Sequence, residues 1–170
     1  VIAGVDIDED GKPEIYTVNT DWFDVVGKDL IPRIYKYEKN ATGQWEVVWW
    51  TRLPLDFQNA WAPLATGDLD NDEKGEIIWG PVNNFASGLQ PNPVRIIVFE
   101  TTGDGSDDMG IDNSDGTWQP NAQWAITAND NENLRPFRWF IHDIDSDGVD
   151  EIVSSIRAGA VGCQIYSVDN

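Results

Sequence analysis

The segment Asp143-Ile-Asp145-Ser-Asp147-Gly148-Val-Asp150-Glu151-Ile152 decides the fold, because its pattern occurs three times in register. The other copies are Asp6-Ile-Asp8-Glu-Asp10-Gly11-Lys-Pro-Glu14-Ile15 and Asp68-Leu-Asp70-Asn-Asp72-Glu73-Lys-Gly75-Glu76-Ile77. Each has Asp at positions 1, 3 and 5, an aliphatic residue at position 2, Glu at position 9 and Ile at position 10. Successive copies begin 62 and 75 residues apart. Self-similarity at such a distance indicates a repeat architecture.

Short apolar runs flank each of these segments. They are rich in β-branched and aromatic residues and are bounded by Gly, Pro, Asn and Asp, which is typical of strands. No window has helical periodicity, and Asn40–Gly43 has the composition of a hairpin turn. We therefore expect an all-β chain with strands at 1–5, 14–18, 33–37 and 45–51, at 64–66, 76–79, 94–99 and 124–127, and at 139–141, 151–155 and 164–168.

Four strands in each repeat predict β-propeller blades of four antiparallel strands, whereas a parallel β-helix has shorter repeats. The expected units are a first blade over 1–55, a second over 56–130 and an incomplete third over 131–170. These make about two and three-quarter blades, and a closed propeller needs about four to eight. We therefore expect either part of a larger propeller or assembly from several copies.

The spacing of the carboxylates suits calcium, a hard cation that takes roughly six to eight oxygen ligands. Positions 1, 3, 5 and 9 offer carboxylates, position 7 offers a carbonyl oxygen, and glycine at position 6 permits a sharp turn. The sequence thus predicts up to three calcium ions (Ca2+). The candidate ligands are Asp6, Asp8, Asp10, Lys12 and Glu14, then Asp68, Asp70, Asp72, Lys74 and Glu76, and finally Asp143, Asp145, Asp147, Val149 and Glu151.

The loops allow two other interpretations. An EF-hand places its bidentate Glu at position 12, where this chain has Thr17, Trp79 and Ser154, and its loop lies between helices. Solvated acidic turns are common in a chain with 30 acidic and 11 basic residues. Four carboxylates crowded in one loop repel one another without a metal, however, and the crowding recurs three times in register.

The three loops, each followed by an aliphatic strand, resemble the calcium loops of FG-GAP/VCBS-type repeats, the blades of integrin-α-like and bacterial extracellular propellers. The resemblance covers the whole chain at the level of blades and departs at Glu73, which takes the glycine position. It implies a non-catalytic, calcium-binding, extracellular or cell-surface segment that serves adhesion, assembly or ligand recognition. The implied partners are an extracellular protein or a polysaccharide, or further copies of the chain.

The formal net charge of −19 disfavours binding to nucleic acid phosphates and to anionic membranes. No run approaches the roughly 18 apolar residues of a membrane-spanning helix. Common catalytic motifs are absent from the sequence, which leaves enzymatic activity open. The alternatives are a lectin, an extracellular fibre subunit, or a polysaccharide-lyase-like propeller that would use Arg135, Arg138 and Arg157.

Tryptophan and cysteine complete the expectations. Blades that pack face to face bury both sheet faces, so most of the nine Trp residues are expected in the core. Trp49 and Trp50 must point to opposite faces of a strand, whereas Trp22 and Trp118 are the candidates for an exposed platform. The single cysteine, Cys163, excludes an internal disulfide and is expected to be buried. The Asp-rich segment 103–116 is expected to be a solvated loop, with a fourth cation site as the alternative.

Overall fold

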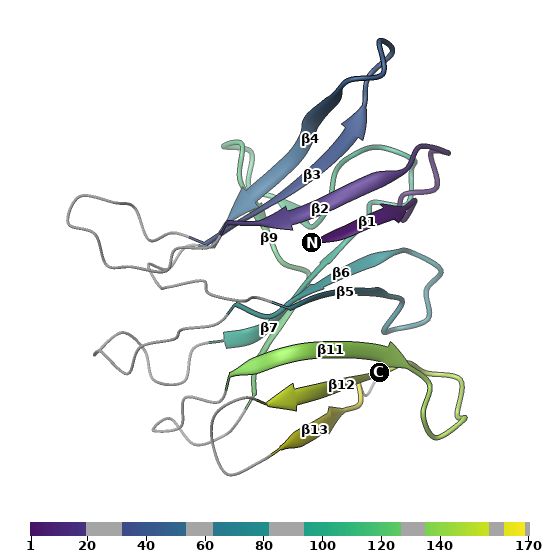
Figure 1. Cartoon of the computed structure of the whole chain (residues 1–170), viewed down its shortest axis with the longest axis vertical. Coiled ribbons are helices and arrows are strands. Elements are labelled where there is room, and N and C mark those ends of the chain that lie inside the picture. The colour runs from purple at the N-terminus through teal and green to yellow at the C-terminus, as the bar shows by residue number, and fades with distance from the viewer. Residues whose placement is uncertain (20–31, 54–62, 82–93, 127–134, 157–161, 169–170) are drawn as a thin grey trace, which may run out of the picture.

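The computed structural model describes residues 1–19, 32–53, 63–81, 94–126, 135–156 and 162–168. Every regular element within these residues is a β-strand, which confirms the all-β class (Figure 1). The strands form four antiparallel sheets, none of which closes on itself. Among the described residues, no helix is suited to crossing a membrane.

The first sheet is a simple meander with the strand order β1-β2-β3-β4. Its strands are β1 (Ile2–Val5), β2 (Glu14–Val18), β3 (Arg33–Lys39) and β4 (Trp45–Arg52). The expected hairpin turn joins β3 to β4, where the Gly43 N–H donates to the Asn40 carbonyl at 2.9 Å. Burial alternates along β3, and its buried side chains are Ile34, Lys36 and Glu38.

The remaining strands form two further large sheets and one small ribbon. The second sheet is ordered β10-β7-β6-β5 and the third β11-β12-β13. The short pair β8-β9 lies in and just after the Asp-rich segment 103–116, so this segment is not simply an unstructured loop. The strands are β5 (Leu64–Gly67), β6 (Glu76–Trp79), β7 (Val94–Glu100), β8 (Ile111–Asp112), β9 (Trp118–Gln119), β10 (Ala122–Ala125), β11 (Pro136–His142), β12 (Glu151–Ile156) and β13 (Cys163–Tyr166).

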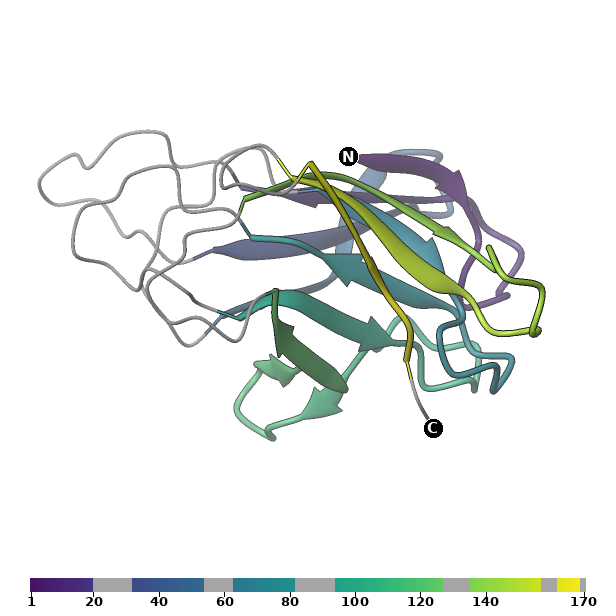
Figure 2. The same ribbon diagram turned by 90° about the horizontal axis from the view of Figure 1, so that it is seen from below.

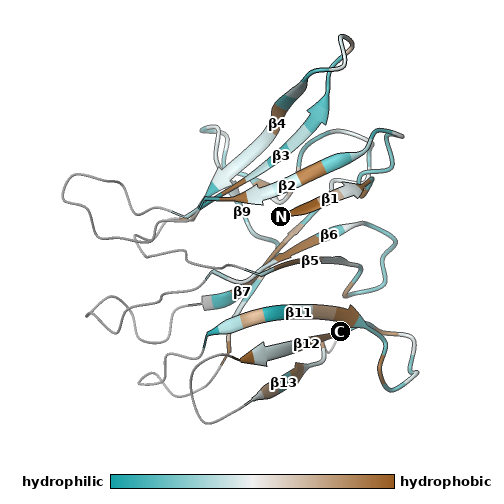
Figure 3. Ribbon diagram, viewed as in Figure 1, coloured by the Kyte–Doolittle hydropathy of each residue, from teal (hydrophilic) through white to brown (hydrophobic). Residues whose placement is uncertain are grey.

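Two hydrophobic cores separate the three large sheets, and the middle sheet contributes to both. Because successive residues of a strand point to opposite faces, Ile77 and Ile78 enter different cores. Figure 3 shows the hydrophobic residues along the strands of all three sheets. The first core contains Tyr16, Ile34, Trp49, Leu53, Ile77, Trp79, Ile97, Phe99 and Met109; the second contains Leu69, Ile78, Ile96, Val98, Ile126, Trp139, Ile152 and Ile156.

The sheets are stacked in one direction. The isoleucine at position 10 faces the preceding sheet, since Ile77 packs in the core shared with the first sheet and Ile152 in the core shared with the second. The next residue faces the following sheet, as Tyr16 and Ile78 show. The three Asp-rich loops consequently lie along the same edge of the stack, which Figures 1 and 2 show from two directions.

Two expectations about burial are wrong for the described residues. Trp49 is buried and Trp50 exposed, as expected, but Trp45 and Trp124 are also exposed and Trp118 is half-buried. Trp45 and Trp50 lie on the uncovered face of the first sheet, and Trp124 lies on β10, the edge strand of the second sheet, so fewer tryptophans are core than expected. Those that are core are Trp49, Trp79 and Trp139. Cys163 is exposed rather than buried, because it lies on the edge strand β13. Trp22 lies outside the described residues.

Candidate metal centre

The three Asp-rich loops have the same backbone conformation. Positions 4 and 6 have positive φ in every copy, a region in which glycine is favoured over other residues. Glu73 has a φ of +68° where the other loops have glycine, so the second loop bends in the same way despite its different residue. At position 4, φ is +60° at Glu9, +58° at Asn71 and +65° at Ser146; at position 6, φ is +86° at Gly11 and +93° at Gly148.

Three hydrogen bonds recur in each loop. The carboxylate at position 1 accepts from the N–H of position 6, that at position 5 from the N–H of position 7, and that at position 9 from the N–H of position 2. The position 9 bonds measure 2.9 Å from Ile7 N to Glu14 Oε2, 2.7 Å from Leu69 N to Glu76 Oε2 and 3.0 Å from Ile144 N to Glu151 Oε2. In the first, second and third loops, the bond to the position 1 carboxylate measures 3.1, 3.0 and 3.0 Å. The bond to the position 5 carboxylate measures 2.8, 3.0 and 2.9 Å. The loops are therefore one structural unit repeated three times.

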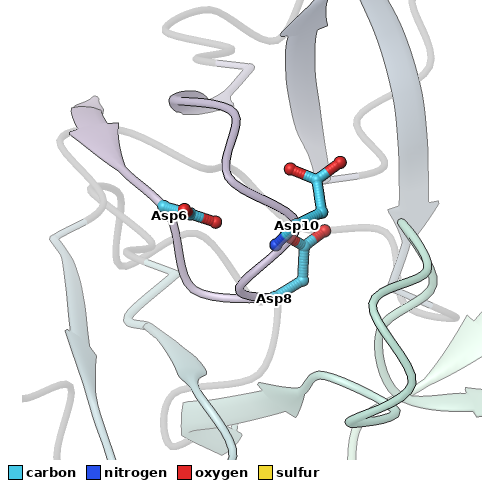
Figure 4. Close-up of side chains that lie close together, drawn as sticks. All are labelled: Asp6, Asp8 and Asp10. Atoms are coloured by element: carbon cyan, nitrogen blue, oxygen red, sulfur yellow. The ribbon is translucent and has the colours of Figure 1, made fainter.

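Each loop brings carboxylate oxygens within 4.8 Å of one another. In the first loop these belong to Asp6, Asp8 and Asp10, whose arrangement Figure 4 shows, and the equivalent residues Asp68, Asp70 and Asp72 gather in the second. In the third loop the group is Asp143, Asp145 and Glu151. Asp147, at position 5, is not in that group, although it accepts the same hydrogen bond from position 7 as Asp10 and Asp72 do. Coordination by the carbonyl oxygens at position 7 stays a prediction.

A glutamate on the third strand of the first two sheets joins these clusters, which the sequence interpretation did not include. Glu38 lies with Asp8 and Glu14, and Glu100 lies with Asp70 and Glu76, so positions 3 and 9 share a second group of carboxylates. The signal was present in the sequence, because Glu38 and Glu100 both follow their position 1 Asp by 32 residues. In the third copy the sequence pattern aligns Asp169 with them, but the strand register does not, because Ile152 pairs with Tyr166 where Ile15 and Ile77 pair with Tyr37 and Phe99.

The position 9 glutamates are buried, and burial disfavours their charged form. Burial raises the pKa of Glu76 to about 7, with the charge of Asp70 acting in the same direction and the hydrogen bond from the Leu69 N–H opposing it. Burial also raises the pKa of Glu14. A cation close to these carboxylates would offset the cost of keeping them ionised, and a donor set made only of oxygens fits a hard cation.

The first loop contains a cation of its own, because the Lys36 side chain is fully buried among four carboxylates. Its ammonium is ion-paired with Asp8 and lies 3.0 Å from Glu14 Oε1, 3.2 Å from Glu38 Oε1 and 3.0 Å from Asp107 Oδ1. Burial alone would lower the pKa of Lys36, but the contacts with Asp8, Asp107 and Glu14 outweigh it and raise that pKa above its usual range.

The lysines at position 7 make a second set of ion pairs through their side chains. Lys12 pairs with Asp10 and, at 3.0 Å, with Glu38. Lys74 pairs in the same way with Asp72 and, at 3.2 Å, with Glu100. In the third loop position 7 is Val149, which carries no charge. The three loops thus present the same carboxylates with different numbers of built-in ammonium groups.

Two pockets lie near the loops and the small ribbon. One of about 530 Å³ lies between the first and second loops and is lined in part by Asp6, Glu9, Asp68 and Glu73, so solvent ions reach both position 1 carboxylates. The other, of about 510 Å³, is lined by Arg52, Leu53, Asn113, Asp115, Thr117, Trp118, Gln119, Pro120 and Gln123.

The arginines proposed for a lyase do not gather at either of these pockets. Arg138 is exposed and Arg135 is partly exposed, and neither lines them. Arg157 lies outside the described residues. Comparison of the chain with protein-family models, curated proteins and solved structures gives no match.

Proposed function

We propose that this chain is a non-catalytic, calcium-binding segment of β-propeller blades. One observation carries the proposal: the same loop structure occurs three times. Each copy has positive φ at positions 4 and 6, the same hydrogen bonds, and a group of carboxylates that lie close together. Calcium fits such a site better than zinc or copper, because every donor is oxygen and no His or Cys lies in the groups. Magnesium would require a more rigid octahedral arrangement.

Calcium would stabilise the fold at the point where the first two strands of each sheet meet. The position 1 Asp follows the first strand and the position 9 Glu begins the second, so a shared ion joins both strands. Binding to the folded state alone adds about 2.7 kcal/mol per site when calcium exceeds its Kd a hundredfold. This contribution would replace the internal disulfides that a chain with one cysteine lacks.

The stacking of the sheets supports the propeller arrangement. The large sheets fall within 1–55, 56–130 and 131–170, one in each expected unit. The end faces of the stack are exposed and apolar: Tyr35 and Trp50 stack on the first sheet, and Phe140 and Ile165 are 61% and 55% exposed on the third. Neighbouring blades cover equivalent faces in a propeller, so further blades or further copies of the chain fit both ends.

Ligand recognition is the function that such blades would serve, and one pocket favours it. Trp118 lines the 510 Å³ pocket together with Arg52 and Asp115, which combines an aromatic surface with charged groups suited to a polar ligand such as a polysaccharide. Titration with neutral and acidic polysaccharides, followed by tryptophan fluorescence, tests this role. A response lost in W118A and retained in W45A, which alters an exposed Trp elsewhere, would support it, and no response to any polysaccharide would count against it.

Calorimetric titration with calcium tests the main proposal. We expect two or three calcium ions per chain at millimolar affinity or tighter, and much weaker binding of magnesium. The absence of binding heat would mean that the loops are solvated acidic turns.

Two further measurements test the alternatives. A lyase would release uronic acid products from polyuronides, so measuring such products distinguishes an enzyme from a non-catalytic segment. Electron microscopy distinguishes a fibre subunit from a monomer.

A further inference from the structure

The three copies differ at one buried position beside the loop. Lys36 on β3 follows its position 1 Asp by 30 residues, and Val98 on β7 does so in the second copy. Strand pairing places Ile165 at this point in the third copy, because Ile165 pairs with Val153 as Lys36 pairs with Tyr16 and Val98 with Ile78. Lys36 and Val98 are both buried, but only the first carries a charge. At this third-strand position, therefore, only the first copy places an ammonium in its carboxylate cluster.

The Lys36 ammonium lies where a metal ion would be held. It contacts Asp8 and Glu14, the residues at positions 3 and 9, and the third-strand Glu38 at 3.2 Å. Asp8 also lies in the group formed with Asp6 and Asp10. The ammonium therefore occupies a carboxylate that calcium would need as a ligand. In the second copy, the corresponding carboxylates of Asp70, Glu76 and Glu100 lie within 4.8 Å of one another, and the equivalent third-strand position carries the apolar Val98. The ammonium of Lys74 contacts this group only at Glu100, at 3.2 Å.

A fourth carboxylate shows that this ammonium serves the interface between sheets. Asp107 belongs to the segment after β7, in the second copy, and its Oδ1 lies 3.0 Å from Lys36 Nζ. Lys36 thus links the first loop to the neighbouring repeat without an ion from solution. A divalent cation entering beside Asp8 would meet this fixed positive charge at close range, and the buried ammonium has no room to move into solvent.

We propose that Lys36 is a tethered cation that takes the place of calcium in the first loop, so that calcium binds only at the second and third loops. This inference rests on the proposed calcium-binding function. The carboxylates of the first loop are then neutralised by Lys36 at any calcium concentration, whereas those of the second and third loops depend on calcium.

Amide spectra of the ¹⁵N-labelled wild-type protein during calcium titration test the inference loop by loop. Gly11 and Gly148 are matched reporters, because both occupy position 6 and donate to the position 1 carboxylate at 3.1 and 3.0 Å. We expect the Gly148 resonance to shift or exchange with added calcium and the Gly11 resonance to stay in place. Shifts of both resonances over the same calcium range would overturn the inference. No shift at Gly11, at Gly148 or at Glu73, the position 6 residue of the second loop, would overturn the proposed function itself.

The variant K36M tests the cause. Its calorimetric stoichiometry should rise by one calcium ion per chain, because Asp8, Glu14 and Asp107 then lack the Lys36 ammonium and Glu38 keeps only that of Lys12. K39M is the matched control: it makes the same substitution on the same strand, but Lys39 is exposed and lies over the Trp45 ring at 5.3 Å. A folded K36M with the stoichiometry of wild type would contradict the inference. If K36M does not fold, the wild-type spectra decide the matter alone.

Discussion

Gly75 of the second loop lies directly against Ile7 of the first loop. A Cβ atom at residue 75 would fall 2.4 Å from the Ile7 carbonyl oxygen and 2.8 Å from the Ile7 Cβ. Both partners are parts of the loops, so neighbouring repeats touch at the edge that carries the Asp-rich loops. The displaced glycine of the second loop is thus explained by packing between repeats, and the turn at Glu73 forms without a glycine.

The variant G75A should therefore destabilise the protein. Added volume against a backbone carbonyl cannot be accommodated without movement of the loop, and such overpacking costs roughly 1–3 kcal/mol. Urea unfolding measures the loss. The matched control is G162A, because a Cβ at Gly162 meets nothing within 4 Å. Equal midpoints for the two variants would show that the contact between loops does not matter for stability.

Replacement of Glu73 by glycine should stabilise the protein. The left-handed backbone conformation at Glu73 costs roughly 1 kcal/mol that glycine does not incur. The comparison variant is E73A, which removes the carboxylate and keeps a Cβ in the left-handed region. Urea midpoints should rank E73G above both wild type and E73A. A gain of the same size in E73A would assign the effect to charge instead of backbone conformation.

Metal-free stability should fall as the pH rises from about 4.5 towards 7. Because burial raises the pKa of Glu76 from 4.5 to about 7, the folded state holds a proton that the unfolded state has released, and this stability is lost once the pH passes the folded pKa. The full contribution is roughly 3 kcal/mol. Urea unfolding in chelator at pH 5 and pH 7.5 measures it, and E76Q should reduce the difference. A difference unchanged in E76Q would assign the effect to other groups.

The third loop offers a paired test of the calcium ligands. D143N should reduce the calcium-induced rise in Tm, because Asp143 belongs to the group of carboxylates that also contains Asp145 and Glu151. D150N makes the same substitution at position 8 of the same loop, outside that group, and should retain the rise. Equal losses in the two variants would indicate that calcium responds only to the total negative charge.

Much of the fold follows from the sequence, since the Asp-rich pattern, with its flanking apolar runs, predicts where the strands of the large sheets lie. The features that the sequence pattern does not predict depend on contacts between segments that are distant in the chain. Glu38 and Lys36 enter the first cluster only because β3 lies beside β2. The β8-β9 ribbon has too short a pattern to predict. Trp45 is exposed because one face of the first sheet lacks a neighbour, and Trp124 lies on the edge strand β10 of the second sheet; a local sequence pattern contains neither piece of information.

Thermal unfolding in calcium, in magnesium and in chelator tests the central claim most directly. Calcium that binds the folded carboxylate clusters must raise Tm with increasing concentration, because ligand binding to the folded state adds to the free energy of unfolding. We predict a rise of several degrees at millimolar calcium, a much smaller rise with magnesium, and the lowest Tm in chelator. Equal Tm values in all three conditions would contradict the account and leave the three loops as acidic turns held by their own hydrogen bonds.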